Sequence, residues 1–162
     1  MKSYNEILPE VIAGLGLNTK YDQGSKLIKK LHIELEDWLG DDLMKCYPVY
    51  FVTENLKNGL ENQKFKGFQF DEMEVTEGEY FEDNFQLNIA LPKFYWMKIV
   101  GKENEDDLYI SPNKSLMADI SFINYVKQNF RTEFLYENLK EDKVREELLE
   151  KLLASAKNRD QI

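Results

Sequence analysis

The order of apolar and polar positions along the chain predicts a protein built mainly of short strands. Residues 47–53 are almost all apolar and β-prone, as in a strand covered on both faces, and residues 94–100, introduced by Pro92, carry the strongest strand pattern. Shorter strands are predicted at residues 108–111, 116–118 and 132–137. A strand with one buried face and one solvent face is predicted where apolar and polar side chains alternate, in the order Leu31, His32, Ile33, Glu34, Leu35 and Glu36. A turn is predicted to follow it at residues 40–42.

The strand pattern of residues 68–75 is irregular. Phe68 and Phe70 share one face of the predicted strand, whereas Met73 and Val75 share the other. Because one extra residue in a strand restores the inward direction of the side chains, we expect a β-bulge at residues 71–72.

Helical patterns are shorter and lie between the strands. Residues 1–30 form a loosely patterned segment, in which a short helix is predicted at residues 4–15. Three further helical segments are predicted: a helix from residue 53 or 54 through Leu56 and Leu60, a helical turn at residues 77–85 capped by Thr76, and a helix capped by Asp119 that carries Phe122, Ile123 and Val126.

The clearest helix is predicted at residues 138–158. Asn138 and Glu141 have the spacing of a capping box. One apolar stripe follows, made of Val144, Leu148, Leu149, Leu152, Leu153 and Ala156. We expect this helix to pack back on the sheet; the alternative is that it extends from the body and mediates dimerisation.

Strands and helices alternate without a regular βαβ rhythm. The sequence therefore predicts an α+β fold, with a mixed or mainly antiparallel sheet, flanking helices and a C-terminal amphipathic helix. A length of 162 residues suits one domain, residues 1–162, and leaves little room for a second independent core.

Charge narrows the classes of partner. The chain has 30 acidic and 21 basic residues, a formal net charge of −9. Nucleic acid and anionic membranes are disfavoured as partners, because lysine and arginine must neutralise their phosphates. A basic protein partner fits, since complementary charge speeds encounter. The alternative is that the acidity only keeps the protein soluble.

Cysteine usage and hydropathy indicate a cytoplasmic location. Cys46 is the only cysteine, so no disulfide within the chain is expected and a reducing compartment fits. The apolar stretch at residues 11–17 is short and contains two glycines, which does not predict a signal peptide. No run reaches the roughly 18 apolar residues of a membrane-spanning helix.

Catalytic and cofactor signals are weak. His32 is the only histidine, and no serine or cysteine nucleophile lies at an informative spacing from it. One histidine and one cysteine do not make a zinc site. Gly14 and Gly16 lack the third glycine of a dinucleotide-binding loop. We therefore expect no catalytic residues, no cofactor and no metal ligands.

Two acidic clusters leave a metal-dependent enzyme open as an alternative. The residues that could bind a hard cation are Asp41 and Asp42 in one cluster, and Glu103, Glu105, Asp106 and Asp107 in the other. The ligand spacing of an EF-hand is absent, and turns rich in aspartate need no metal to explain them.

One segment combines acids with aromatic residues. No basic residue occurs between Lys66 and Lys93, whereas seven acids and five aromatic residues occur there. Acids steer a basic partner and aromatic side chains supply anchors. The candidate partner-binding residues are Asp71, Glu72, Glu74, Glu77, Glu79, Tyr80, Phe81, Glu82 and Asp83. The alternative is that the aromatic residues are core and the acids form a solvated loop.

The order of several segments resembles a known class of proteins. The segments are residues 67–71 (GFQFD), 91–96 (LPKFYW), 106–110 (DDLYI) and a strand-to-helix unit at residues 116–126. Together they resemble small bacterial immunity proteins found beside polymorphic or contact-dependent toxins, over roughly residues 31–139. The sequence departs from that pattern at Asp119-Ile120, where Ser-Glu is expected.

The resemblance implies an antidote that binds one cognate toxin in the cytoplasm and blocks its active site or the access of substrate. Many such toxins are nucleases with basic clefts, where an acidic surface would compete with phosphate. The residues leave a second interpretation open, a homodimeric interaction module that associates through the apolar stripe of the C-terminal helix.

Overall fold

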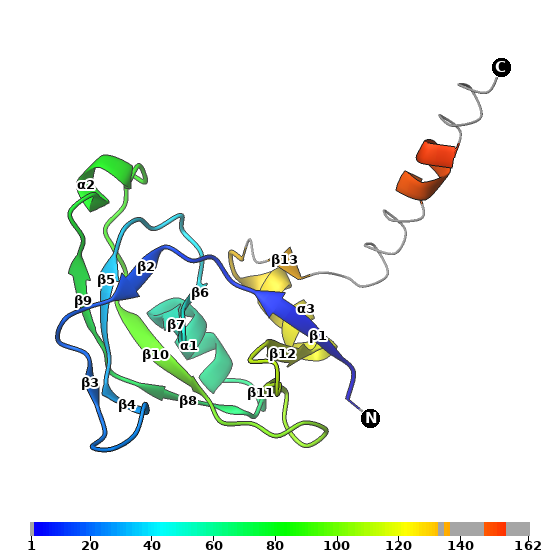
Figure 1. Ribbon diagram of the computed structural model, residues 1–162, viewed down its shortest axis with the longest axis horizontal. Coiled ribbons are helices and arrows are strands. Elements are labelled where there is room, and N and C mark those ends of the chain that lie inside the picture. The colour runs from blue at the N-terminus through cyan, green and yellow to red at the C-terminus, as the bar shows by residue number, and fades with distance from the viewer. Residues whose placement is uncertain (1, 133–134, 137–147, 155–162) are drawn as a thin grey trace.

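The structure is a computed structural model that describes residues 2–132, 135–136 and 148–154 (Figure 1). Its elements follow the order β1 (Tyr4–Leu8), β2 (Ala13–Leu15), β3 (Lys20–Tyr21), β4 (Ile28–Lys30), β5 (His32–Leu35), β6 (Leu43–Cys46), β7 (Val49–Thr53), α1 (Glu54–Glu61), β8 (Phe68–Asp71), β9 (Glu74–Glu77), α2 (Phe81–Asn84), β10 (Phe94–Ile99), β11 (Leu108–Ile110), β12 (Leu116–Asp119), α3 (Ile120–Asn129) and β13 (Leu135–Tyr136). Residues 148–154 are also helical.

A four-stranded antiparallel sheet, in the order β6-β7-β10-β8, forms the centre of the fold. All residues of β7 are buried, which confirms the prediction of a strand covered on both faces. Tyr50 and Val52 point into one hydrophobic core, and Val49 and Phe51 point into another. The central sheet therefore separates a first core from a second core.

The first core is covered mainly by helices. Leu56 and Leu60 of α1 and Phe122 of α3 pack in this core with Val52 and Met97 of the central sheet. A second sheet, in the order β11-β12-β1-β13, borders it. The predicted cap of α3 is confirmed, because the side chain of Asp119 accepts a hydrogen bond from a backbone amide of that helix. The helix predicted from residue 53 or 54 is α1, and the side chain of Thr53 caps it by accepting a hydrogen bond from the amide of Leu56.

The second core is covered by a smaller sheet, in the order β2-β5-β9. Ile33 and Leu35 of β5 pack in it together with Phe51 and Trp96 of the central sheet. β5 and β9 run parallel, with Leu35 opposite Glu77. The other ladders are antiparallel apart from one isolated bridge, so the described chain has the predicted α+β fold with mostly antiparallel sheets.

The prediction of a helix at residues 4–15 is wrong. This stretch contains β1, which pairs with β12 and β13, and β2, which pairs with β5. The loosely patterned segment 1–30 thus contributes β1, β2, β3 and β4. Its strands form because distant parts of the chain complete their hydrogen bonds, and local apolar spacing does not reveal such partners.

The predicted β-bulge at residues 71–72 is also wrong. Asp71 ends β8, which pairs with β10 in the central sheet, whereas Glu74 begins β9, which pairs with β5 in the smaller sheet. The change in periodicity therefore marks the point where the chain leaves one sheet and enters another. This crossing carries the acidic segment from the central sheet to the edge of β5.

The solvent-facing position predicted for His32 is wrong, because its side chain is only 5% exposed. The amide of Asn18 donates to Nδ1 of His32 at 3.1 Å, so Nδ1 carries no proton. Nε2 then donates to the hydroxyl of Thr76, which lies 2.7 Å away. Thr76 is a residue of β9 and does not cap α2, which begins after Tyr80 without a side-chain cap.

The turn predicted at residues 40–42 is more buried than its composition indicates. Asp41 and Asp42 are both buried. The carboxylate of Asp42 accepts hydrogen bonds from the Thr53 hydroxyl at 2.5 Å and from the amide of Arg131 at 2.9 Å. It therefore joins the start of α1 to the chain after α3.

Only part of the predicted C-terminal region lies within the described residues. β13 falls inside the strand predicted at residues 132–137, and residues 148–154 are helical within the predicted helix 138–158. Asn138, Glu141, Val144 and Ala156 lie outside the described residues. No described helix has the length and apolar character needed to cross a bilayer.

The four described leucines of the predicted apolar stripe do not pack back on the sheet as expected. Leu148, Leu149, Leu152 and Leu153 are 55%, 58%, 64% and 62% exposed. Both faces of the central sheet are already covered by other elements.

Substitution of Gly14 in β2 and of Gly16, which follows β2, tests the packing around His32. A Cβ on Gly16 would lie 2.1 Å from Nδ1 of His32, whereas a Cβ on Gly14 would meet nothing within 4 Å. We expect Gly16→Ala to lower the free energy of unfolding by about 1–3 kcal/mol, because the imidazole must move and lose its hydrogen bonds. Gly14→Ala is the matched control and should leave stability nearly unchanged. Equal urea midpoints for the two variants would contradict this packing.

Candidate functional site

The candidate acidic segment is divided by the fold into two groups. Three of its acids are paired with lysines: Asp71 with Lys98 at 2.8 Å, Glu72 with Lys93 at 3.2 Å and Glu74 with Lys30 at 3.9 Å. The hydrogen bond from Lys98, together with one from the amide of Glu72, lowers the pKa of Asp71. These three carboxylates lie between the end of β8 and the start of β9 and are largely balanced by lysines of the same molecule.

The other acids surround α2 and stay unbalanced. Glu77, Glu79, Glu82 and Asp83 are exposed, and none forms an ion pair with any residue that the structure describes. Tyr80 lies among them and is 58% exposed. This group therefore presents unpaired negative charge beside one accessible aromatic ring.

Phe81 has a different role from the one expected of a contact residue. Its side chain is 3% exposed, packs in the second core and stacks on Phe85 with ring centres 5.0 Å apart. Phe68 and Phe70, two further aromatic residues of this segment, pack against the first core. For these residues the structure matches the alternative interpretation, in which the aromatics are core.

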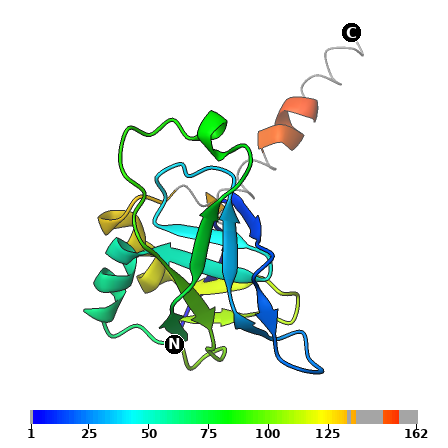
Figure 2. The same ribbon diagram turned by 90° about the vertical axis from the view of Figure 1, so that its left-hand side faces the viewer.

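Backbone contacts hold the α2 region at the end of β5 and β9. The amide of Gly78 donates to the carbonyl of Leu35 at 2.7 Å, and the side chain of Asn84 donates to the carbonyl of Glu36 at 3.0 Å. Because β5 and β9 are parallel, both strands end at this edge, and the chain turns there into α2. Figure 2 shows α2 beyond the ends of these strands.

Sequence reasoning missed one member of this acidic group. Glu36 follows β5 and is exposed. A Cβ on Gly78 would lie 2.9 Å from Oε1 of Glu36, so the carboxylate of Glu36 lies over the turn into α2. Only the parallel pairing of β5 with β9 brings Glu36 to this position. We call the exposed set the acidic loop surface, which consists of Glu36, Glu77, Glu79, Tyr80, Glu82 and Asp83.

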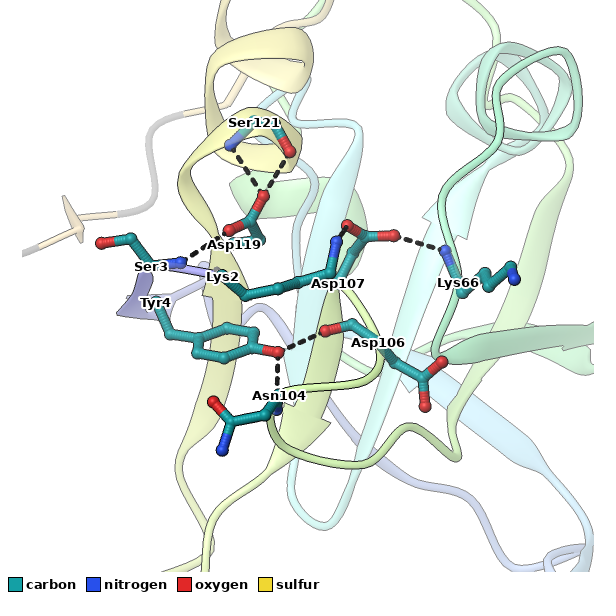
Figure 3. A network of polar contacts seen from close by, with 9 residues as sticks. All are labelled: Lys2, Ser3, Tyr4, Lys66, Asn104, Asp106, Asp107, Asp119 and Ser121. Atoms are coloured by element: carbon teal, nitrogen blue, oxygen red, sulfur yellow. Dashed lines mark hydrogen bonds and ion pairs between the residues drawn. The ribbon is translucent and has the colours of Figure 1, made fainter.

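A second group of polar side chains lies at the N-terminal strand (Figure 3). The carboxylate of Asp107 accepts hydrogen bonds from Nζ of Lys2 at 2.6 Å and from the amide of Lys66 at 2.7 Å. The hydroxyl of Tyr4 donates to the carbonyl of Asp106 at 2.5 Å and accepts from the amide of Asn104 at 2.9 Å. These bonds tie β1 to the loop that precedes β11.

Asp119 completes this network at the start of α3. It accepts hydrogen bonds from the amide of Ser3 at 3.0 Å and from both the amide and the hydroxyl of Ser121. Burial alone would raise the pKa of Asp119, but the hydrogen bonds from Ser121 and Ser3 outweigh it and lower the pKa. The carboxylate is thus fully used in capping α3 and fastening the N-terminal strand, which is a structural role.

Several carboxylates of the two acidic clusters that were candidates for cation binding form hydrogen bonds within the protein instead. Asp106 accepts a hydrogen bond from the amide of Lys102 at 2.7 Å, whereas Asp107 is bonded to Lys2 and Lys66. Asp42 is bonded to Thr53 and Arg131. Among the described residues, no three histidine, cysteine or acidic side chains are grouped so that they could hold a metal ion.

Comparison of the chain with protein-family models, with curated proteins and with solved structures gave no match. The function is therefore inferred from the surface of the molecule.

Proposed function

We propose that this protein is a non-catalytic inhibitor that binds a basic protein, a cognate toxin, through the acidic loop surface. The observation that carries the proposal is the group of unpaired carboxylates around α2, at Glu77, Glu79, Glu82 and Asp83, on an anchored loop. An unpaired carboxylate keeps its full charge for a partner, whereas Asp71, Glu72 and Glu74 are already paired within the molecule.

Anchoring of the loop supports tight binding. Phe81 is buried in the second core, and Gly78 and Asn84 are hydrogen-bonded to the end of β5. Because the loop is held before the partner arrives, little conformational entropy is lost on association. Tyr80 is exposed at its centre and suits the role of an aromatic anchor surrounded by charge.

The charge of the surface suits a partner whose active site binds phosphate. The cleft of a nucleic-acid enzyme is lined with lysine and arginine, and carboxylates placed over it compete with phosphate for these side chains. Opposite charge also accelerates encounter, so that the inhibitor captures its target quickly at low ionic strength.

The first test is the capture of the partner. We expect the tagged protein, purified from its native host, to carry one basic protein in a 1:1 ratio, identified by mass spectrometry, and we expect that protein to be toxic when expressed alone. A preparation that contains no partner, or only acidic proteins, would contradict the proposed function.

Charge reversal tests the surface once that partner is in hand. The variant Glu79→Lys, Glu82→Lys, Asp83→Lys should lower the association rate by at least about tenfold at low salt, measured by stopped-flow or surface plasmon resonance. The matched control is Glu61→Lys, Glu103→Lys, Glu105→Lys, which changes the net charge equally at other exposed positions. Equal loss of binding in both variants would assign the effect to overall charge and reject the acidic loop surface as the site.

A further inference from the structure

A groove of about 1220 Å³ lies beside the β3–β4 hairpin, and this hairpin lies at the end of the molecule opposite to α2 (Figure 2). The groove is bordered by the β3–β4 hairpin, the turn between β6 and β7, and the ends of β10 and β11. β4 leads through Leu31 into β5, whereas Gly78, just before α2, is hydrogen-bonded to Leu35 at the other end of β5. The hairpin that borders the groove and the acidic loop therefore lie beyond opposite ends of this strand (Figure 2). The charged lining residues of the groove are Lys26, Lys45, Lys98, Lys114 and Asp22.

The groove is therefore basic in a protein whose net charge is −9. Lys98 is paired with Asp71. Lys26, Lys45 and Lys114 form no ion pair with any described carboxylate. This part of the surface has positive charge without a partner, just as the acidic loop surface has negative charge without one.

Two of these lysines flank one tyrosine. Nζ of Lys114 lies 3.4 Å from the hydroxyl of Tyr47, and Nζ of Lys45 lies 6.0 Å from the centre of the same ring. The side chain of Tyr47 is 61% exposed. Two ammonium groups and a phenolic hydroxyl thus converge at one side of the groove, where a carboxylate would be favourably placed.

The rest of the groove offers apolar surface to an aromatic side chain. Leu27 and Tyr21 on the hairpin are 69% and 50% exposed, and Ile28 and Val49 also line the wall. Exposed apolar residues next to charged ones are typical of protein interaction sites. The groove therefore combines positive charge with a hydrophobic surface in one place.

We propose that this groove binds the α2 loop of a second copy of the chain. The loop supplies Glu79, Glu82 and Asp83 for the unpaired lysines, and the exposed ring of Tyr80 for the apolar wall. Each surface provides the charge that the other lacks. Since the loop and groove of one molecule lie beyond opposite ends of β5, the contact forms between copies.

The overall charge favours this occupant over nucleic acid. A net charge of −9 repels a phosphate backbone along its whole length, whereas the α2 loop presents only a short acidic segment. Two copies also repel each other at long range, so the contact depends on short-range complementarity and is weak. High salt screens it, because the Debye length falls to about 3 Å at 1 M salt.

This self-association uses the acidic loop surface, which is also the proposed toxin-binding surface, but it does not require a toxin to be present. A second copy bound at the α2 loop would hide the acidic loop surface, so self-association and inhibition would exclude each other. Neutralising the groove leaves the acidic loop intact, and such a variant should still bind the proposed partner.

Complementary neutral variants provide the test. We expect the mass of the wild-type protein, measured by sedimentation velocity, to rise with protein concentration at 0.15 M salt, where the Debye length is about 8 Å. At about 1 M salt the mass should return to that of a monomer. The groove variant Lys45→Gln, Lys114→Gln and the loop variant Glu79→Gln, Glu82→Gln, Asp83→Asn should each weaken self-association by about tenfold or more. Mixed together they should form a 1:1 pair, because each keeps the surface that the other has lost.

The matched control is Lys20→Gln, Lys29→Gln, which removes two exposed lysines that do not line the groove and should associate like the wild type. A wild-type protein that stays monomeric at millimolar concentration would overturn the proposal. So would a groove variant that associates as strongly as the wild type, since the contact would then lie elsewhere. Circular dichroism of each variant establishes that it is folded.

Discussion

Burial of β7 on both faces is the constraint on which the rest of the structure depends. Tyr50 and Val52 need an apolar cover on one side, and Val49 and Phe51 need one on the other. A strand of this kind is stable only when two separate layers pack against its sheet. The helices α1 and α3 provide one layer, and the sheet that contains β5 provides the other. The polar ties of Asp42, Asp107 and Asp119 then fasten the connecting segments around these layers.

The second layer also decides where the acidic loop is placed. β9 reaches it by leaving β8 and the central sheet at Asp71, and its parallel pairing with β5 brings Glu77 next to the end of β5. Phe81 is drawn into the second core, which anchors the loop but removes its ring from the surface. The same packing that stabilises the fold thus leaves Tyr80 and its acidic neighbours exposed.

The net charge of this protein does not predict the charge of each part of its surface. A value of −9 suggests a uniformly acidic surface, but the acids from the end of β8 to the start of β9 are paired with lysines, and the groove beside the β3–β4 hairpin is lined by three lysines that form no ion pair with a carboxylate of the described residues. At physiological ionic strength, charges further apart than about 8 Å are largely screened. The local composition of each surface therefore governs which partner it accepts.

The sequence by itself determined the central strands, the start of α1, the cap of α3 and the α+β class, because these features depend on short-range periodicity and on side chains that bond to nearby amides. It also located the acidic segment. Only the tertiary structure decided that residues 4–15 form strands, that residues 68–75 divide between two sheets, and that His32 is buried beneath Gly16. The physical reason is that strand pairing and ion pairing join residues far apart in the chain, so neither the ladders nor the balance of charge on each surface can be read from neighbouring positions.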